Sequence, residues 1–199
     1  MTVLPVSFPA PERRVRLGNA PMLAWNDWHL LLSLILPSLG SMKPKVYIET
    51  SIPSFYHETR TSPEAVARRN WTRDWWEAKR HLYEIVSSDA VQSEIEFTPE
   101  PKLQQCLDFL ASLPLLAITP PVIEIVSVYT HNKLMPANSS GDALHLALAS
   151  YYRCDYLLTW NCKHLANANK FGHIRRINST LGLYVPTLIT PLELLGETP

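Results

Sequence analysis

Short apolar runs alternate with longer helical patterns from residue 42 to the end of the chain. The runs are rich in β-branched, aromatic and aliphatic residues and are bounded by turn residues, which is typical of strands. The sequence predicts strands over Lys45–Glu49, Ser88–Val91, Leu115–Ile118, Tyr156–Thr159 and Pro186–Thr190. Between them it predicts helices over Ser62–Val86, Pro101–Leu113, Pro120–Lys133, Ala143–Tyr152 and residues 163–183.

This alternation predicts an α/β fold with a central parallel sheet. The run Tyr156–Thr159 is almost wholly apolar, as strands that are buried on both faces of a sheet are. Helices should therefore cover both faces of the sheet. The segment Thr50–Pro53 is expected to break the first strand. Ligands of such sheets bind at the carboxyl ends of the strands, so polar residues that follow a strand are the first candidates for function.

The first 41 residues have a different character. They contain five of the 17 prolines and one apolar run, Leu30–Leu36, which is far shorter than the roughly 20 residues that span a bilayer. Arginines before that run resemble a signal peptide, but Asp27 and His29 directly precede the run and Pro37 ends it. We interpret residues 1–41 as a poorly ordered leader or an over-long translation start, and residues 42–199 as the folded domain.

Composition narrows the possible functions. The 18 Lys and Arg residues balance 18 Asp and Glu residues, which disfavours binding of nucleic acid by bulk positive charge. Hydrophobic residues make up 46%, enough for a sizeable core. The six glycines lie too far apart for a phosphate-binding loop. The three cysteines lack CxxC spacing, which disfavours a disulfide framework and fits a reducing, cytoplasmic setting.

Four polar residues fall where the ligand-binding edge of the sheet is expected. They are Glu49 at the end of the first strand, Glu94 after the second, Asp142 in the first turn of a helix, and Asn161 after the fourth strand. Carboxylate and amide oxygens suit Mg²⁺ or Mn²⁺ rather than zinc. Such an ion activates water and stabilises the leaving oxygen of a phosphodiester, so the pattern indicates hydrolysis of an anionic substrate.

Each acid also has an ordinary structural interpretation. Asp142 favours the helix dipole from the first turn, an effect of about 0.3–1 kcal/mol. Glu94 competes with Glu96 for the second position, and either one could be a solvated helix residue. Glu49 is the most informative acid, because a carboxylate that ends a buried strand is costly unless it is paired or bound to a metal.

Four segments, in this order and spacing, resemble a PIN domain, and most closely the VapC toxin type. The segments are Val46–Ser51, Ser93–Ile95, Asp142–Ala147 and Asp155–His164. The most specific features are the strand-end acid followed by Thr-Ser, the Asp-Ala-Leu-His helix start, and Leu-Leu-Thr-Trp-Asn. The resemblance extends over about residues 45–195.

The resemblance implies a three-layer α/β/α fold and a Mg²⁺- or Mn²⁺-dependent endoribonuclease. It further implies a toxin that is often a homodimer and that a cognate antitoxin inhibits. The expected substrate is RNA, and no interaction with a membrane is expected. Glu49, Glu94 and Asp142 would hold the metal, and these three residues with Asn161 would form the catalytic site. Thr50, Ser51 and Thr159 match the small hydroxyl residues beside that site.

Two positions depart from the family pattern. Glu49 stands where the family usually has Asp, so its longer side chain must retract or shift the metal. Asn161 stands where a fourth acid often occurs, and the lost charge should weaken binding of a second metal. These two departures support the alternative of a catalytically weak or inactive PIN-fold module that binds RNA or protein. A nuclease with the same chemistry but a housekeeping role in RNA processing is a further alternative, which the sequence does not separate from a toxin.

The stretch Arg60–His81 combines basic residues with tryptophans. Trp71 and Trp75 have the i, i+4 spacing of a core-facing helix side, so we expect them to pack inward. The arginines fit RNA phosphates and a partner surface equally well. His145 lies on the same helix face as Asp142 and is expected to fill a polar position beside the site.

Overall fold

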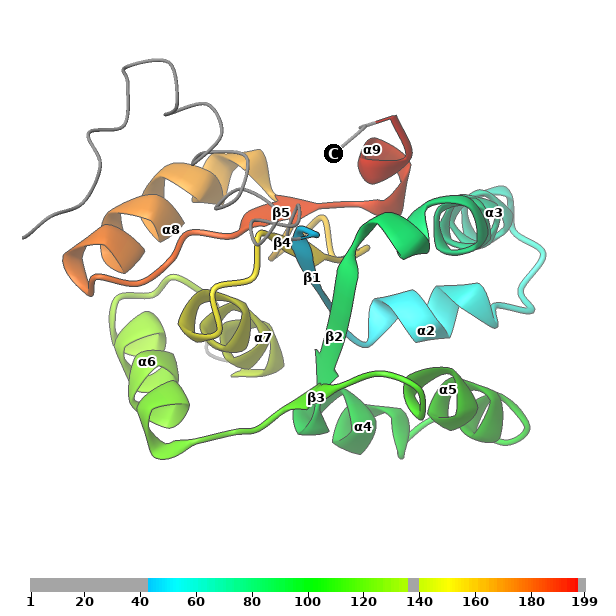
Figure 1. The fold of residues 1–199 in the computed structure, drawn as a ribbon, viewed down its shortest axis with the longest axis horizontal. Helices are drawn as coiled ribbons and strands as arrows, with labels where there is room; N and C mark the ends of the chain where they lie inside the picture. The colour runs from blue at the N-terminus through cyan, green and yellow to red at the C-terminus, as the bar shows by residue number, and fades with distance from the viewer. Residues whose placement is uncertain (1–42, 136–139, 197–199) are drawn as a thin grey trace, which may run out of the picture. The chain divides into compact units, whose positions relative to one another are not determined.

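Five parallel strands form the central sheet (Figure 1). The computed structural model describes residues 43–135 and 140–196, and the leader proposed for residues 1–41 lies outside them. The strands are β1 Lys45–Ile48, β2 Glu84–Ser88, β3 Leu115–Leu116, β4 Tyr156–Leu158 and β5 Thr187–Ile189. Their order is β3-β2-β1-β4-β5, so β1 is central and the chain crosses to its other side between β3 and β4.

Helices cover both faces of this sheet (Figure 1). One face carries α2 Ser51–Tyr56, α3 Pro63–Lys79 and α9 Pro191–Gly196, and the other carries α6 Pro120–His131, α7 Ser140–Tyr151 and α8 Ala168–Thr180. The helices α4 Asp89–Ile95 and α5 Lys102–Leu110 connect β2 to β3. This three-layer α/β/α arrangement around a parallel sheet confirms the predicted fold class.

The core forms where the central strand meets helices on both sides. Val46, Tyr47 and Ile48 of β1 are fully buried, as strands covered on both faces must be. Trp75 is also fully buried, which confirms the inward packing predicted for it. Trp71 is partly buried and stacks on Trp160 with ring centroids 6.0 Å apart. Trp71 therefore packs against the segment that follows β4.

A buried polar network joins the three helices of the other face. The Tyr129 hydroxyl of α6 donates to Asn178 Oδ1 of α8 at 2.6 Å. The Asn178 amide donates in turn to Ser150 Oγ of α7 at 2.9 Å and to the Tyr184 carbonyl at 2.8 Å. All three side chains are almost completely buried, so these bonds satisfy groups that would otherwise be costly to desolvate.

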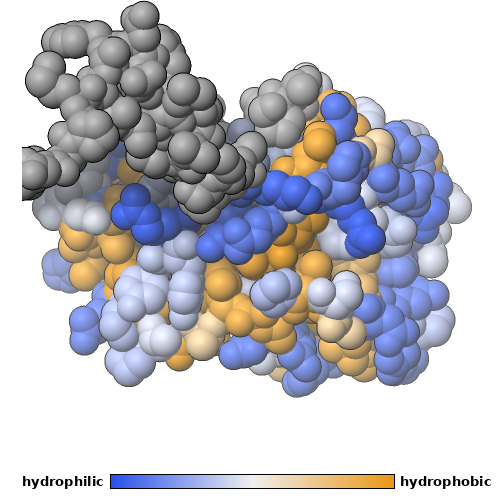
Figure 2. All heavy atoms as spheres, in the orientation of Figure 1, coloured by the Kyte–Doolittle hydropathy of each residue, from blue (hydrophilic) through white to orange (hydrophobic). Residues whose placement is uncertain are grey.

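The outward side of α3 is polar, whereas its inward side buries Ala65, Thr72, Trp75 and Trp76. Figure 2 shows hydrophilic residues gathered over α3 and α5 on the face in view. Within the part of the chain that the structure describes, no helix combines the length and the apolar character needed to cross a membrane.

The second strand and its neighbouring helices differ from the prediction. The strand predicted over Ser88–Val91 is wrong: β2 spans Glu84–Ser88, and α4 begins at Asp89. The helix predicted to continue to Val86 ends at Lys79 and is followed by a 3-10 turn over Arg80–Leu82. The strand is difficult to recognise in the sequence because Ser87 and Ser88, although buried, interrupt the apolar run that is typical of a strand.

Two short helices are additional to the predicted elements. The helix α2 starts at Ser51, inside the segment that was expected only to break the strand. Pro53 is tolerated there because a first helical turn needs no backbone donor at that position. The helix α9 follows β5 directly and packs against α3.

The buried Glu58 forms an ion pair with the largely exposed Arg60 at the connection between α2 and α3. Its carboxylate accepts hydrogen bonds from the Arg60 guanidinium at 2.6 Å and from the Thr59 and Arg60 backbone amides at 2.9 and 3.0 Å. Lys102 Nζ lies 3.7 Å away. The Arg60 side-chain hydrogen bond is the largest influence, and together these donors lower the pKa of Glu58 from its ordinary 4.5 to about 2.

We predict that Glu58→Gln lowers the free energy of unfolding at pH 7 by about 1–3 kcal/mol. The folded-state pKa is depressed, so the stabilisation is fully present above pH 4.5 and is lost as the pH falls toward 2. Urea unfolding of both proteins at pH 7 and at about pH 3 measures this, and the difference should shrink at the lower pH. The control Glu64→Gln removes a mostly exposed i, i+4 partner and should cost under about 0.5 kcal/mol.

Candidate functional site

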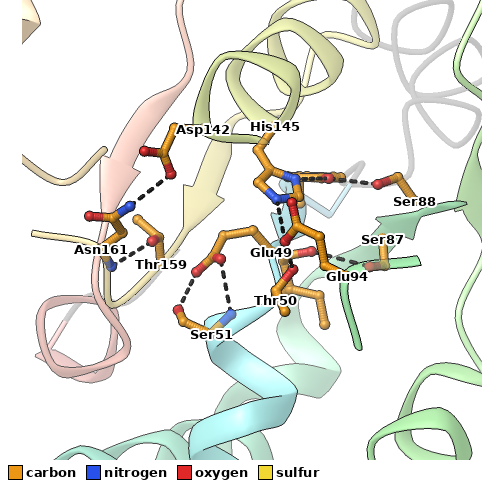
Figure 3. A network of polar contacts seen from close by, with 12 residues as sticks. Glu49, Thr50, Ser51, Ser87, Ser88, Glu94, Asp142, His145, Thr159 and Asn161 are labelled. Carbon is orange, nitrogen blue, oxygen red and sulfur yellow. Dashed lines mark hydrogen bonds and ion pairs between the residues drawn. The ribbon is translucent and has the colours of Figure 1, made fainter. Parts of the chain in front are cut away.

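The four predicted site residues lie side by side at the carboxyl end of the sheet (Figure 3). Glu49 directly follows β1, and Asn161 follows β4, the strand paired with β1. Asp142 lies in the first turn of α7 and Glu94 near the end of α4. The crossing of the chain between β3 and β4 brings these distant segments together, as is usual for open parallel sheets.

Glu49 is 5% exposed, and the start of α2 holds its carboxylate. The Ser51 backbone amide donates to Glu49 Oε2 at 2.9 Å, and the Ser51 hydroxyl donates to Oε1. Burial raises the pKa of Glu49 above its ordinary value, although the His145 charge and hydrogen bonds from Ser51 and Thr159 act in the opposite direction. The side chain thus turns toward the helix that follows it.

Glu94 connects three elements through one carboxylate oxygen. Its Oε2 accepts a hydrogen bond from the Thr50 hydroxyl and lies 3.2 Å from His145 Nε2. Burial alone would raise the pKa of Glu94, but the hydrogen bond and charge of His145, together with Thr50, lower it. The acid that the sequence placed after a strand is therefore fixed between the α2 start and α7.

His145 belongs to a buried chain of polar groups behind this acid. Its Nδ1 lies 2.8 Å from the Tyr47 hydroxyl, which lies 2.7 Å from Ser88 Oγ. Burial would lower the pKa of His145, but the hydrogen bond and charge of Glu94, and then the charges of Glu49 and Asp142, raise it. The residue fills a polar position beside the site, as the sequence predicted, and it ties β1 and β2 to α4.

Asp142 and Asn161 form a direct pair. The Asn161 amide donates to Asp142 Oδ1 at 2.7 Å, while Asn161 Oδ1 accepts from the His164 backbone amide at 3.1 Å. The Asn161 backbone amide donates to Thr159 Oγ1 at 2.8 Å. Both ends of the Asn161 side chain are thus engaged, and the neutral amide orients the acid at the start of α7.

Gly141 allows Glu94 to approach the first turn of α7. A Cβ at this position would lie 2.6 Å from Glu94 Oε1, closer than real Cβ contacts allow. Any other residue would therefore displace the Glu94 carboxylate. A glycine in a helix weakens it by about 0.5–1 kcal/mol relative to alanine, and the close approach of Glu94 is a structural reason for glycine at this position.

The acids lie close together but do not form a complete metal-binding group. Among the residues described, no three His, Cys, Asp or Glu side chains are placed so that they could hold one ion. Both oxygens of Glu49 turn toward Ser51. Glu94 Oε1 and Asp142 Oδ2 accept no hydrogen bond from residues 43–135 or 140–196, which leaves one oxygen of each acid unengaged by the described residues.

Sequence reasoning missed three contributors to this arrangement. Tyr47 looked like an ordinary strand aromatic, yet its hydroxyl orients His145. Ser88 was expected to start a strand and Ser87 lay outside the predicted elements, yet the two serines form the buried end of β2. Ser87 Oγ donates to the Ile48 carbonyl at 3.2 Å. Consecutive polar residues in a sequence do not reveal a buried hydrogen-bond network by themselves. The network is recognised only when the residues that contact them in the folded protein are known.

Comparison with known proteins gives a structural likeness but no match in sequence. No family model matches the chain, and no curated protein matches it. Among solved structures, the chain is similar to VapBC2 from Rickettsia felis, described as bound to a DNA fragment from its promoter. The identity is 17%, the match covers 73% of this chain and 98% of the other, and the TM-score is 0.43. A likeness of this size supports no statement about activity.

We predict that Tyr47→Phe lowers the free energy of unfolding by about 1–2 kcal/mol. The change removes one buried hydroxyl and leaves His145 Nδ1 and Ser88 Oγ without their shared partner. Urea unfolding measures the effect, with Tyr151→Phe as the control because Tyr151 is 39% exposed. Equal stability of the two variants would show that the polar chain does not support the site.

Proposed function

We propose that this protein is a Mg²⁺- or Mn²⁺-dependent endoribonuclease of the PIN type, acting as the toxin of a toxin–antitoxin pair. The observation that supports this most is the meeting of Glu49, Glu94, Asp142 and Asn161 from four separate segments at the ligand-binding edge of the sheet. The PIN-like sequence segments supply these same positions. RNA is the proposed substrate, and a cognate antitoxin and a second copy of the chain are the proposed partners.

Glu94 and Asp142 would hold the metal through Oε1 and Oδ2, the oxygens not engaged by the described residues. Glu49 would add negative charge beside them and contact the ion through water, because Ser51 holds its carboxylate. When bound, the ion would lower the pKa of a water and offset the charge of a phosphodiester. Three acids without a cation would repel such a substrate.

The remaining groups would position these acids. Asn161 donates to Asp142 Oδ1 and so leaves the other oxygen turned away from the amide. His145 and Thr50 hold Glu94 Oε2 in the same way and leave Oε1 for the ion. Each ligand would thus be held by one oxygen and would bind metal with the other, which is the usual arrangement of outer-shell support.

An inactive module that binds RNA or protein is the second candidate, and a specific observation favours it. Both oxygens of Glu49 are hydrogen-bonded within the protein, and Asn161 occupies one oxygen of Asp142. An acid cluster stabilised by its own neighbours needs no ion to exist. The two candidates differ in whether substitution of Asp142 changes metal binding and RNA cleavage.

We predict that Asp142→Asn reduces Mn²⁺-dependent cleavage of single-stranded RNA by about 100-fold or more, since loss of even an outer-shell partner costs about 10–100-fold. Asp89→Asn is the matched control. Asp89 is an exposed acid in the first turn of α4, so it shares the helix-dipole effect but not the site. Gel assays with end-labelled RNA and Mn²⁺ titration calorimetry provide the two readouts.

Unchanged cleavage in Asp142→Asn would overturn the nuclease assignment at this site. A wild-type protein that binds RNA but neither binds Mn²⁺ nor cleaves would instead support the inactive module. Equal losses in Asp142→Asn and Asp89→Asn would attribute the effect to helix stability rather than to metal binding.

We predict that Gly141→Ala weakens Mn²⁺ binding by about 10-fold or more. The new methyl group displaces the end of the Glu94 side chain and strains its contacts with Thr50 and His145, and the higher helix propensity of alanine offsets part of that cost. Gly172→Ala in α8 is the matched control, because a Cβ there meets nothing within 4 Å. Metal binding that survives Gly141→Ala intact would remove Glu94 from the ligand set.

A further inference from the structure

A small hollow lies between the end of α2 and the start of α3. Its volume is about 160 Å³, and it is lined by Phe55, Arg60, Ser62, Glu64, Ala65 and Arg68. Two guanidinium groups and one aromatic ring therefore border the same space. None of these residues belongs to the acidic site described above.

The hollow is linked directly to that site through Trp160. Arg68 Nη1 donates to the Trp160 carbonyl at 3.4 Å, and the Trp160 backbone amide donates to Ser51 Oγ at 2.8 Å. Trp160 is followed in sequence by Asn161, and Ser51 holds Glu49. The backbone of one residue, Trp160, therefore contacts both Arg68 at the hollow and Ser51 at the acidic site.

Arg68 is held in place by aromatic rings rather than by a strong ion pair. Its guanidinium carbon lies 5.4 Å from the ring centroids of both Phe55 and Trp160. Its one ion pair, to Glu64 at 2.7 Å, has a partner that is 74% exposed. Such surface pairs contribute little stability, so a phosphate can replace the carboxylate.

Arg60 is anchored at one end and exposed at the other. Its Nη2 binds the buried Glu58, yet 68% of its side chain is exposed. The neighbouring arginines do not line the hollow, and they donate to the Glu58 carbonyl (Arg69) and to the Tyr56 carbonyl (Arg73). Arg60 and Arg68 are thus the members of the basic stretch that can reach a ligand beside the site.

We propose that this hollow binds the phosphate backbone and an unstacked base of single-stranded RNA next to the acidic site. The inference rests on the proposed function and names the part of the surface that holds the substrate. Guanidinium groups bind phosphate through two parallel hydrogen bonds and also stack on bases. Single-stranded RNA exposes both features, and its recognition commonly combines arginine with aromatic side chains.

The charge distribution favours RNA over an acidic protein segment. Three acids at the adjacent site repel any polyanion, so a nucleic acid substrate needs nearby cations to remain bound while a metal neutralises the acids. Arg60 and Arg68 provide these cations within the zero net charge of the whole chain. Binding of RNA is therefore limited to this part of the surface, and the affinity should decrease strongly as the salt concentration rises.

The test measures RNA binding independently of cleavage. Fluorescence anisotropy with a labelled single-stranded RNA oligonucleotide is carried out on the Asp142→Asn protein at about 50 and 200 mM salt. Adding Arg60→Gln and Arg68→Gln should weaken binding at low salt by about 10-fold and reduce the salt slope by about 0.7 for each lost phosphate contact. The control Arg175→Gln with Arg176→Gln removes two exposed charges from α8 and should change affinity less than about 2-fold.

The single variant Arg68→Gln tests RNA binding without loss of folding. The ion-pair partner of Arg68 is mostly exposed, so no buried charge loses its partner. It should weaken binding by about 3-fold or more with an unchanged melting temperature. Unchanged affinity and salt slope in the double variant would overturn the inference, as would equal losses in the α8 control or no RNA binding by the parent protein. Cleavage of RNA by the wild-type protein is measured separately in each case. A negative result for RNA binding at the hollow is therefore distinguishable from a negative result for the nuclease assignment.

Discussion

The burial of Glu49 at the end of the central strand is the constraint around which the site is built. A charged carboxylate that is 5% exposed is costly unless donors surround it. Ser51 supplies a backbone amide and a hydroxyl, which requires the chain to turn into α2 immediately after β1. The Glu49 backbone amide donates to the Leu158 carbonyl of β4 at 3.4 Å. The strand end, the helix start and β4 are thus linked by one acid.

The same edge of the sheet joins its two outer layers. Thr50 and His145 hold Glu94 from opposite faces, since Thr50 precedes α2 and His145 belongs to α7. Tyr47 and Ser88 extend this chain into β1 and β2. Structural support and candidate chemistry therefore use the same side chains, and a polar network of this kind is stable only when every member has a partner.

The sequence predicted the sheet and the candidate residues better than it predicted how they contact one another. Apolar runs such as Tyr156–Thr159 marked strands correctly because the pattern reports burial on both faces. The second strand was misplaced, because Ser87 and Ser88 are buried through hydrogen bonds rather than through apolar character. The approach of Glu94 to Gly141 joins residues far apart in the chain, and no local pattern encodes it. The orientation of Glu49 toward Ser51 likewise depends on the completed fold.

The strand order has a consequence for the synthesis of the protein. Glu49 and Glu94 emerge from the ribosome well before Asn161, yet Asn161 and Thr159 come from the segment that follows the switch to the other side of β1. Contacts between such distant segments form only after the intervening chain is made, and a domain of this size folds as a unit. A nascent or truncated chain that ends before β4 therefore carries all three acids without the arrangement that positions them. The site comes into existence only with a nearly complete polypeptide.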